Sequence, residues 1–131
     1  MAVPVKSQRM DRTGRRLVIV IYIIALAVGT STHINDIVTN GILPYRNAPM
    51  WLNIYWTTLT LLDPLAILLL CIRLRAGVFL TLATMVTDVA FNSYAGLVIW
   101  KISFFQNVPL LLQAAFLAFV VLTAPRLLHR R

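Results

Sequence analysis

Two aspartates, Asp63 and Asp88, each lie near the middle of a long apolar stretch of the chain. A carboxylate at the centre of a bilayer costs about 2.5–3.5 kcal/mol on insertion scales, so such a residue is by default a candidate functional site. Neither stretch contains a lysine or an arginine, and two like charges close together in a low dielectric do not both ionise easily. We therefore expect at least one carboxyl to be protonated, and a proton or an organic cation to be the natural ligand.

Other polar side chains accompany each aspartate at helical spacing. The first set is Asn53, Thr57, Thr60 and Asp63, and the second set is Thr81, Thr84, Asp88 and Asn92. Spacings of three and four residues place each set on one face of a helix. Apolar residues fill most of the other positions, so we expect both polar faces to point into a helical bundle.

The remaining apolar stretches add polar groups that could join these faces. They are Tyr22, Thr30, His33, Asp36 and Gln113. Most of these groups belong to the half of the membrane opposite the termini, which predicts a polar pocket open toward that side or toward its leaflet, with the carboxyls at its floor. The candidate ligand-binding or proton-binding residues are Asp63, Asp88, Asn92, Thr60, Thr84, Asn53, Thr57, Gln113, His33 and Asp36.

The elements that must position these residues are membrane-spanning helices. The chain has 131 residues, of which 60% are hydrophobic and only 12% charged, a composition that excludes a soluble domain. Four apolar stretches of about 20 residues each can cross a bilayer, at residues 17–37, 51–72, 78–100 and 108–124. We predict an all-α, integral membrane four-helix bundle over residues 17–125, between basic tails at 1–16 and 126–131. The first stretch also resembles a secretory signal peptide, so its cleavage remains an alternative.

The basic residues predict the orientation of this bundle. Of the 12 Lys and Arg residues, Arg46 and Lys101 lie in the first and third connections, and the other ten lie in the tails and at Arg73 and Arg75. Because basic residues concentrate on the cytoplasmic side, both termini are expected there, in a bacterial inner membrane or a plasma membrane. The net charge of +8 is then explained by the anionic membrane surface and not by nucleic acid.

Motifs for cofactor chemistry are absent from the sequence. His33 and Asp36 share a helical face and could serve a metal or a proton relay, but two ligands do not make a metal site. Polar residues at a helix end that face water are the favoured interpretation. The single cysteine, Cys71, excludes an internal disulfide. No Walker loop, nucleophile elbow or HExxH sequence occurs. We expect no metal and no other cofactor, and the question whether the chain is an enzyme stays open, with a binding protein favoured.

Several interpretations of the polar residues remain. The aspartates could instead hold helices together, although polar contacts in membranes contribute only about 0.6 kcal/mol on average. Pro64 deprives the Thr60 carbonyl of its helical partner, which is typical either of backbone lining a cavity or of a bend that improves packing. The predicted function is binding of a lipophilic or cationic small molecule. The alternatives are a proton-coupled transporter acting as a dimer, and an accessory subunit of a larger membrane complex without chemistry of its own.

The pattern also resembles a known family. The residues that carry the resemblance are His33, Leu43 and Pro44 after the first span, Trp51 at the start of the second, Asp63 with Pro64, and Asp88 with Asn92. Over residues 29–126 they resemble the EXPERA-type four-helix membrane family, which includes emopamil-binding sterol isomerases and sigma-2-receptor-like proteins. Aspartates stand here where that family has glutamates. The resemblance implies sterol or lipophilic-amine binding, with the carboxyls neutralising a cation or a cationic transition state.

Overall fold

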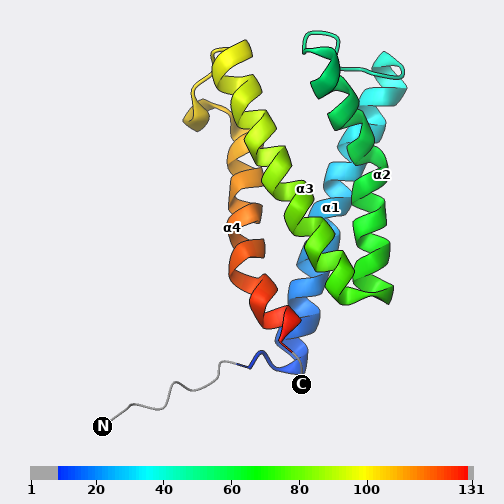
Figure 1. Cartoon of the computed structure of the whole chain (residues 1–131), viewed down its shortest axis with the longest axis vertical. Coiled ribbons are helices and arrows are strands. Elements are labelled where there is room, and N and C mark those ends of the chain that lie inside the picture. Colours follow the sequence, from blue (N-terminus) through cyan, green and yellow to red (C-terminus); the bar gives the residue numbers. More distant parts are fainter. Residues whose placement is uncertain (1–8, 130–131) are drawn as a thin grey trace.

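A computed structural model describes residues 9–129 of the chain, and this part is helical throughout its regular structure (Figure 1). The long helices are α1 (Arg12–Asn40), α2 (Met50–Ile72), α3 (Leu74–Tyr94) and α4 (Val108–Leu128). A π-helix, η1 (Ala95–Ile99), extends α3, and a short 3-10 helix, η2 (Phe104–Gln106), precedes α4. Four helices are long and apolar enough to cross a membrane. The predicted all-helical architecture is therefore confirmed, and it indicates an integral multi-pass membrane protein.

The helices extend beyond the expected apolar spans. α1 begins at Arg12, inside the expected basic tail, because the Asp11 carboxylate caps it by accepting a hydrogen bond from the Gly14 amide at 2.8 Å. Residues 1–8 of that tail, and residues 130–131 of the other, lie outside the described part. The expectation that α4 stops at Pro125 is wrong. The helix continues to Leu128 because Leu127 packs into the core with 2% of its surface exposed.

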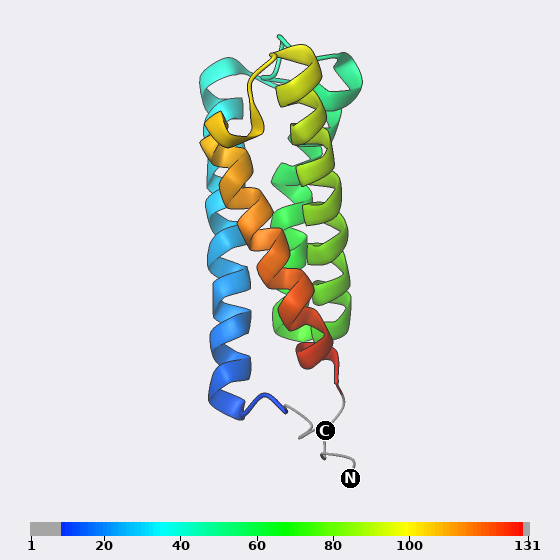
Figure 2. The same cartoon turned by 90° about the vertical axis from the view of Figure 1, so that its left-hand side faces the viewer.

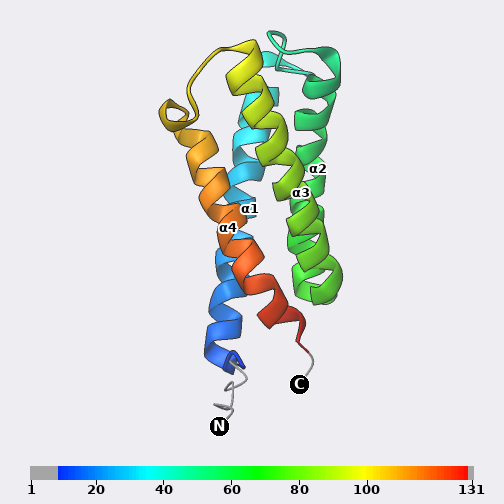
Figure 3. The same ribbon diagram turned by 60° about the vertical axis from the view of Figure 1, so that its left-hand side comes forward.

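The helices are arranged in sequence order around the bundle. α1 packs against α2, α2 against α3 and α3 against α4, whereas the contact between α1 and α4 is much less extensive. Figure 2 shows α4 crossing the bundle obliquely, and Figure 3 shows the pairing of α2 with α3. The start of α1, the α2–α3 turn and the end of α4 lie at one end of the bundle (Figure 1), which we call the basic end. The opposite end, with the connections 41–49 and 100–107, is the loop end.

Two hydrophobic clusters fill the bundle, one toward each end. The cluster toward the basic end is formed by Val18, Tyr22, Leu26, Ala66, Leu70, Val78, Val120, Ala124 and Leu127. The Tyr22 hydroxyl shares a 2.7 Å hydrogen bond with Thr123 and so joins α1 to α4. The cluster toward the loop end is formed by Leu52, Trp56, Leu59 and Ala95. Asp63 lies on α2 between the residues of the two clusters, so the acidic side chains occupy the zone where the apolar core is interrupted.

The connection between α1 and α2 is held by Asn53. Its side-chain oxygen accepts from the Tyr45 amide at 3.0 Å, and its side-chain nitrogen donates to the Leu43 carbonyl at 3.0 Å. Leu43 has a φ of 59°, a left-handed conformation that is unfavourable for a residue with a branched side chain. The buried Asn53 amide therefore fixes a strained loop from inside the bundle.

Replacing Asn53 by alanine is expected to lower the free energy of unfolding by about 1–2 kcal/mol, because both loop backbone groups lose their partner. Thermal unfolding of the purified protein in detergent measures this loss. Asn47→Ala, at an exposed position of the same loop, is the matched control and should leave the midpoint unchanged. Equal midpoints for the two variants would show that other contacts hold the loop.

Candidate functional site

One face of α2 carries three buried polar groups without protein partners. Trp56, Thr60 and Asp63 follow at intervals of four and three residues, and we call them the α2 stripe. Among the described residues, no hydrogen-bond partner lies within reach of the Trp56 Nε1 or of the Thr60 Oγ1, and both atoms are buried. The Asp63 side chain is 7% exposed and has no hydrogen-bond partner in residues 9–129. Because buried polar groups are nearly always paired, two buried unpartnered atoms beside a carboxyl group without a hydrogen bond indicate a place where something else can bind.

The α1 backbone lies close to the Asp63 carboxylate at Gly29. A β-carbon added to Gly29 of α1 would lie 3.1 Å from Asp63 Oδ2. The missing side chain lets the α1 backbone approach the carboxylate while leaving no donor beside it. Pro64, the next residue, lacks an N–H, yet α2 continues through it without interruption. The helix therefore tolerates the loss of one backbone hydrogen bond at this point, which is compatible with both interpretations of Pro64.

Asp88 has a different environment. Its side chain is 8% exposed, and its Oδ1 accepts a 2.9 Å hydrogen bond from the Asn92 side-chain nitrogen. The same nitrogen donates to Gln113 Oε1 at 2.8 Å, which links α3 to α4. Asp88 and Asp63 are close enough to interact electrostatically. The two carboxyls thus share the interior, but Asp63 faces α1, whereas Asp88 is tied toward α4.

Three of the predicted site residues are occupied by structural hydrogen bonds. The Thr84 hydroxyl donates to the Leu80 and Thr81 carbonyls of its own helix at 2.9 and 3.0 Å, and Thr57 donates to the Asn53 carbonyl at 2.7 Å. Asn53 uses its amide for the loop, as described above. At the centre, Asp88, Asn92 and Gln113 are joined to one another by hydrogen bonds. Among the described residues, Thr60 and Asp63 are the predicted site residues there whose side chains have no hydrogen-bond partner.

His33 and Asp36 form a separate group nearer the loop end, joined by Tyr45. The Tyr45 hydroxyl donates to Asp36 Oδ2 at 2.8 Å and lies 2.7 Å from His33 Nδ1. Since a phenol has one proton to donate, the His33 Nδ1 must carry the hydrogen of the second bond. Burial and the neighbouring Asp36 carboxylate both raise the pKa of Tyr45, so its phenol stays protonated. The result is a continuous donor–acceptor chain from His33 through Tyr45 to Asp36.

Aromatic contacts connect Tyr45 to the α2 stripe. The Tyr45 ring meets the Trp56 ring edge to face, with centroids 5.1 Å apart. Trp56 also stacks on Trp100, at 5.9 Å and an interplanar angle of 19°. The indole is therefore held in a fixed orientation between the loop end and Thr60. Among residues 9–129, no group of three or more His, Cys, Asp or Glu side chains could hold a metal ion.

Four residues of this region were missed by sequence reasoning. Trp56 and Tyr55 are not among the predicted site residues, although the spacing of Trp56 to Thr60 and Asp63 contains the signal for the α2 stripe. Tyr55 shares a 2.7 Å hydrogen bond with Thr87 between α2 and α3. Tyr45 and Gly29 gave no periodic signal, because their roles depend on which segments meet in three dimensions.

Comparison with known proteins gives no relative for this arrangement: the chain matches no protein-family model, no curated protein and no solved structure.

Proposed function

We propose that this protein binds a lipophilic or cationic small molecule within its helical bundle, with Asp63 as the principal counter-charge. The observation that carries the proposal is the set of unpartnered buried groups on the α2 stripe. Leaving a buried donor or acceptor unsatisfied costs about 1–3 kcal/mol, and more for a charged group. A ligand that satisfies these groups recovers that free energy, whereas a purely structural role for Asp63 has no contact in the described residues to support it.

The stripe also suggests how the ligand is oriented. Asp63 accepts hydrogen bonds from a cationic N–H, Thr60 can donate or accept, and the Trp56 indole N–H donates only. The seven helical steps from Trp56 to Asp63 span about 10 Å along the helix. The ligand therefore carries its cationic group at the depth of Asp63 and an acceptor nearer the loop end. Asp88, already held by Asn92, adds negative potential from α3.

We extend the proposal to the orientation of the bundle in the membrane and to the ligand classes that the family resemblance implies. The concentration of basic residues at one end supports placing that end in the cytoplasm, with a bacterial inner membrane or a plasma membrane as the host. The ligand then enters from the opposite side or from the leaflet there. Membership in the EXPERA-type family would make sterols and lipophilic amines the first compounds to try.

The test is a search for copurified ligand by mass spectrometry. The wild type is compared with the double variant Asp63→Asn and Asp88→Asn, which keeps side-chain volume while removing both charges. We expect a small molecule in the wild-type spectrum that is lost from the double variant. The control is Asp11→Asn, because asparagine caps a helix about as well as aspartate and Asp11 is exposed far from the stripe. Identical spectra for wild type and double variant would favour an accessory subunit.

A proton-coupled transporter is the second candidate, favoured by the hydrogen-bonded chain His33–Tyr45–Asp36. Such a chain can pass a proton over about one turn of α1 near the loop end. The two functions differ in a direct observable. A transporter supports substrate flux driven by a pH gradient across proteoliposomes and is isolated as a dimer, whereas a binding protein shows saturable binding without flux.

A further inference from the structure

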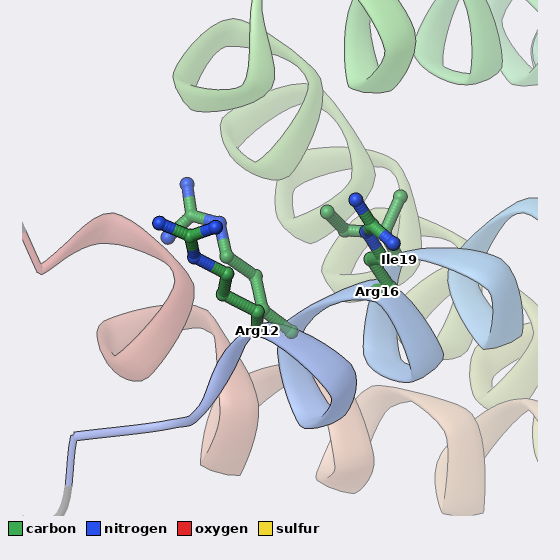
Figure 4. A pocket seen from close by; sticks show the side chains of 4 residues that line it. Arg12, Arg16 and Ile19 are labelled. Carbon is green, nitrogen blue, oxygen red and sulfur yellow. The ribbon is translucent and has the colours of Figure 1, made fainter.

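A surface cavity of about 310 Å³ lies at the basic end of the bundle (Figure 4). Its lining consists of Arg12, Arg15, Arg16 and Ile19, all from the first two turns of α1. Arg12, Arg16 and Ile19 recur at intervals of four and three residues, which places them on one helical face. The cavity is thus lined by three arginine side chains and one apolar side chain, at the point where α1 changes from polar to apolar sequence.

The positive charge of this cavity is not neutralised by its own lining. No acidic residue lines it, and the Asp11 carboxylate is engaged by the Gly14 amide as the helix cap. Arg15 donates from Nη1 to the Leu127 carbonyl at 3.0 Å, so α4 holds one guanidinium in place. Within residues 9–129, Arg12 and Arg16 have no hydrogen-bond or ion-pair partner. One cavity is therefore lined by Arg15, whose guanidinium is held by α4, and by two arginines whose guanidinium groups can bind a ligand.

We propose that this cavity binds the phosphate group of an anionic phospholipid from the leaflet at the basic end. Guanidinium groups bind phosphate oxygens through paired, charge-assisted hydrogen bonds. Basic residues just outside a membrane span lie at the level of anionic headgroups, and Ile19 offers an apolar surface where the acyl chains begin. This site is separate from the α2 stripe and does not depend on the function proposed for it.

The α2–α3 turn supplies a matched control for general electrostatic attraction. Arg73 and Arg75 are at the same end of the bundle and are exposed, but they do not line the cavity. Removing either pair of arginines changes the net charge equally. If the variants of the two arginine pairs differ in lipid binding, the difference is therefore due to the cavity and not to the total positive charge at the basic end.

The experiment measures bound lipid by native mass spectrometry of the detergent-purified protein, titrated with phosphatidylglycerol or phosphatidylcholine. Arg12→Gln combined with Arg16→Gln is expected to weaken phosphatidylglycerol binding about tenfold, while Arg73→Gln combined with Arg75→Gln changes it less than about twofold. Phosphatidylcholine binding should be weaker in the wild type and the same in all variants. Equal losses in both double variants would overturn the proposal.

Two further arms complete the test. Inorganic phosphate is added as a competitor, and displacement of phosphatidylglycerol at micromolar concentration would overturn the lipid assignment in favour of free phosphate. Arg12→Lys combined with Arg16→Lys keeps the charge and the helix but loses the paired geometry, so we expect only partial binding. If the glutamine variant does not fold, this lysine variant carries the test, and full binding by it would contradict a guanidinium site.

Discussion

Asp63→Leu is expected to leave the bundle at least as stable as the wild type while weakening the binding of a protonated amine by at least about tenfold. The affinity loss follows from removal of a charge-assisted hydrogen bond, which contributes about 1.5–3 kcal/mol, and each 1.4 kcal/mol is about a factor of ten. The unchanged stability follows from the absence of any hydrogen bond to Asp63 from residues 9–129. A fluorescent alkylamine titrated into the detergent-purified protein measures the affinity, and thermal unfolding measures the stability.

The two measurements together distinguish a ligand-binding role of Asp63 from a role in holding the helices together. If Asp63 held helices together, the leucine variant would unfold at a lower temperature. Tyr22→Phe is the positive control for such a loss, because it removes the hydrogen bond from Tyr22 to Thr123 between α1 and α4. A leucine variant that is less stable than Tyr22→Phe, or that binds the amine as tightly as the wild type, would contradict the role assigned to Asp63.

Gly77→Ala is expected to lower the free energy of unfolding by about 3 kcal/mol. A β-carbon at this position would overlap the backbone of α2 at Leu70, with the Leu70 Cα only 2.7 Å away and the Leu69 carbonyl carbon 2.8 Å away. Backbone cannot rotate aside as a side chain can, so α2 and α3 must separate, and overpacking of this kind costs about 1–3 kcal/mol or more. Thermal unfolding or the yield of folded protein in detergent measures the effect.

Gly96→Ala is the control for this variant. Gly96 is also buried, but a β-carbon there would meet the Asn107 side-chain nitrogen at 3.2 Å, and that amide can shift. We expect a much smaller loss than at Gly77. Comparable losses at the two glycines would mean that burial of the new methyl, and not collision with the neighbouring helix, determines the cost.

The sequence allowed the helices and their inward faces to be predicted, because both depend on local periodicity. Asn53, Thr84, Asp63 and Asp88 are all buried, as their spacing indicated. The roles of these residues could not be predicted in the same way. Whether a polar side chain is free or already bonded depends on its partners, and Thr84 satisfies itself within its own helix whereas Asp63 finds no partner in the described part of the chain.

Helix ends and irregular turns were also beyond prediction. Pro125 is usually a stop signal, but tertiary packing of Leu127 and the bond from Arg15 to the Leu127 carbonyl carry α4 past it. The π-helix at Ala95–Ile99 has no local sequence signature. It accompanies the stacking of Trp100 on Trp56 from another helix, a contact between residues far apart in the sequence.

The sparse contact between α1 and α4 has a consequence for where the bundle can open. Hydrogen bonds between these helices join Arg15 to Leu127 and Tyr22 to Val120 and Thr123, toward the basic end. Because these hydrogen bonds lie at one end, the rest of the α1–α4 boundary is the part of the bundle where two helices can separate with the smallest loss of contacts. Separating the first and last helices there would leave the more extensive α1–α2, α2–α3 and α3–α4 contacts intact.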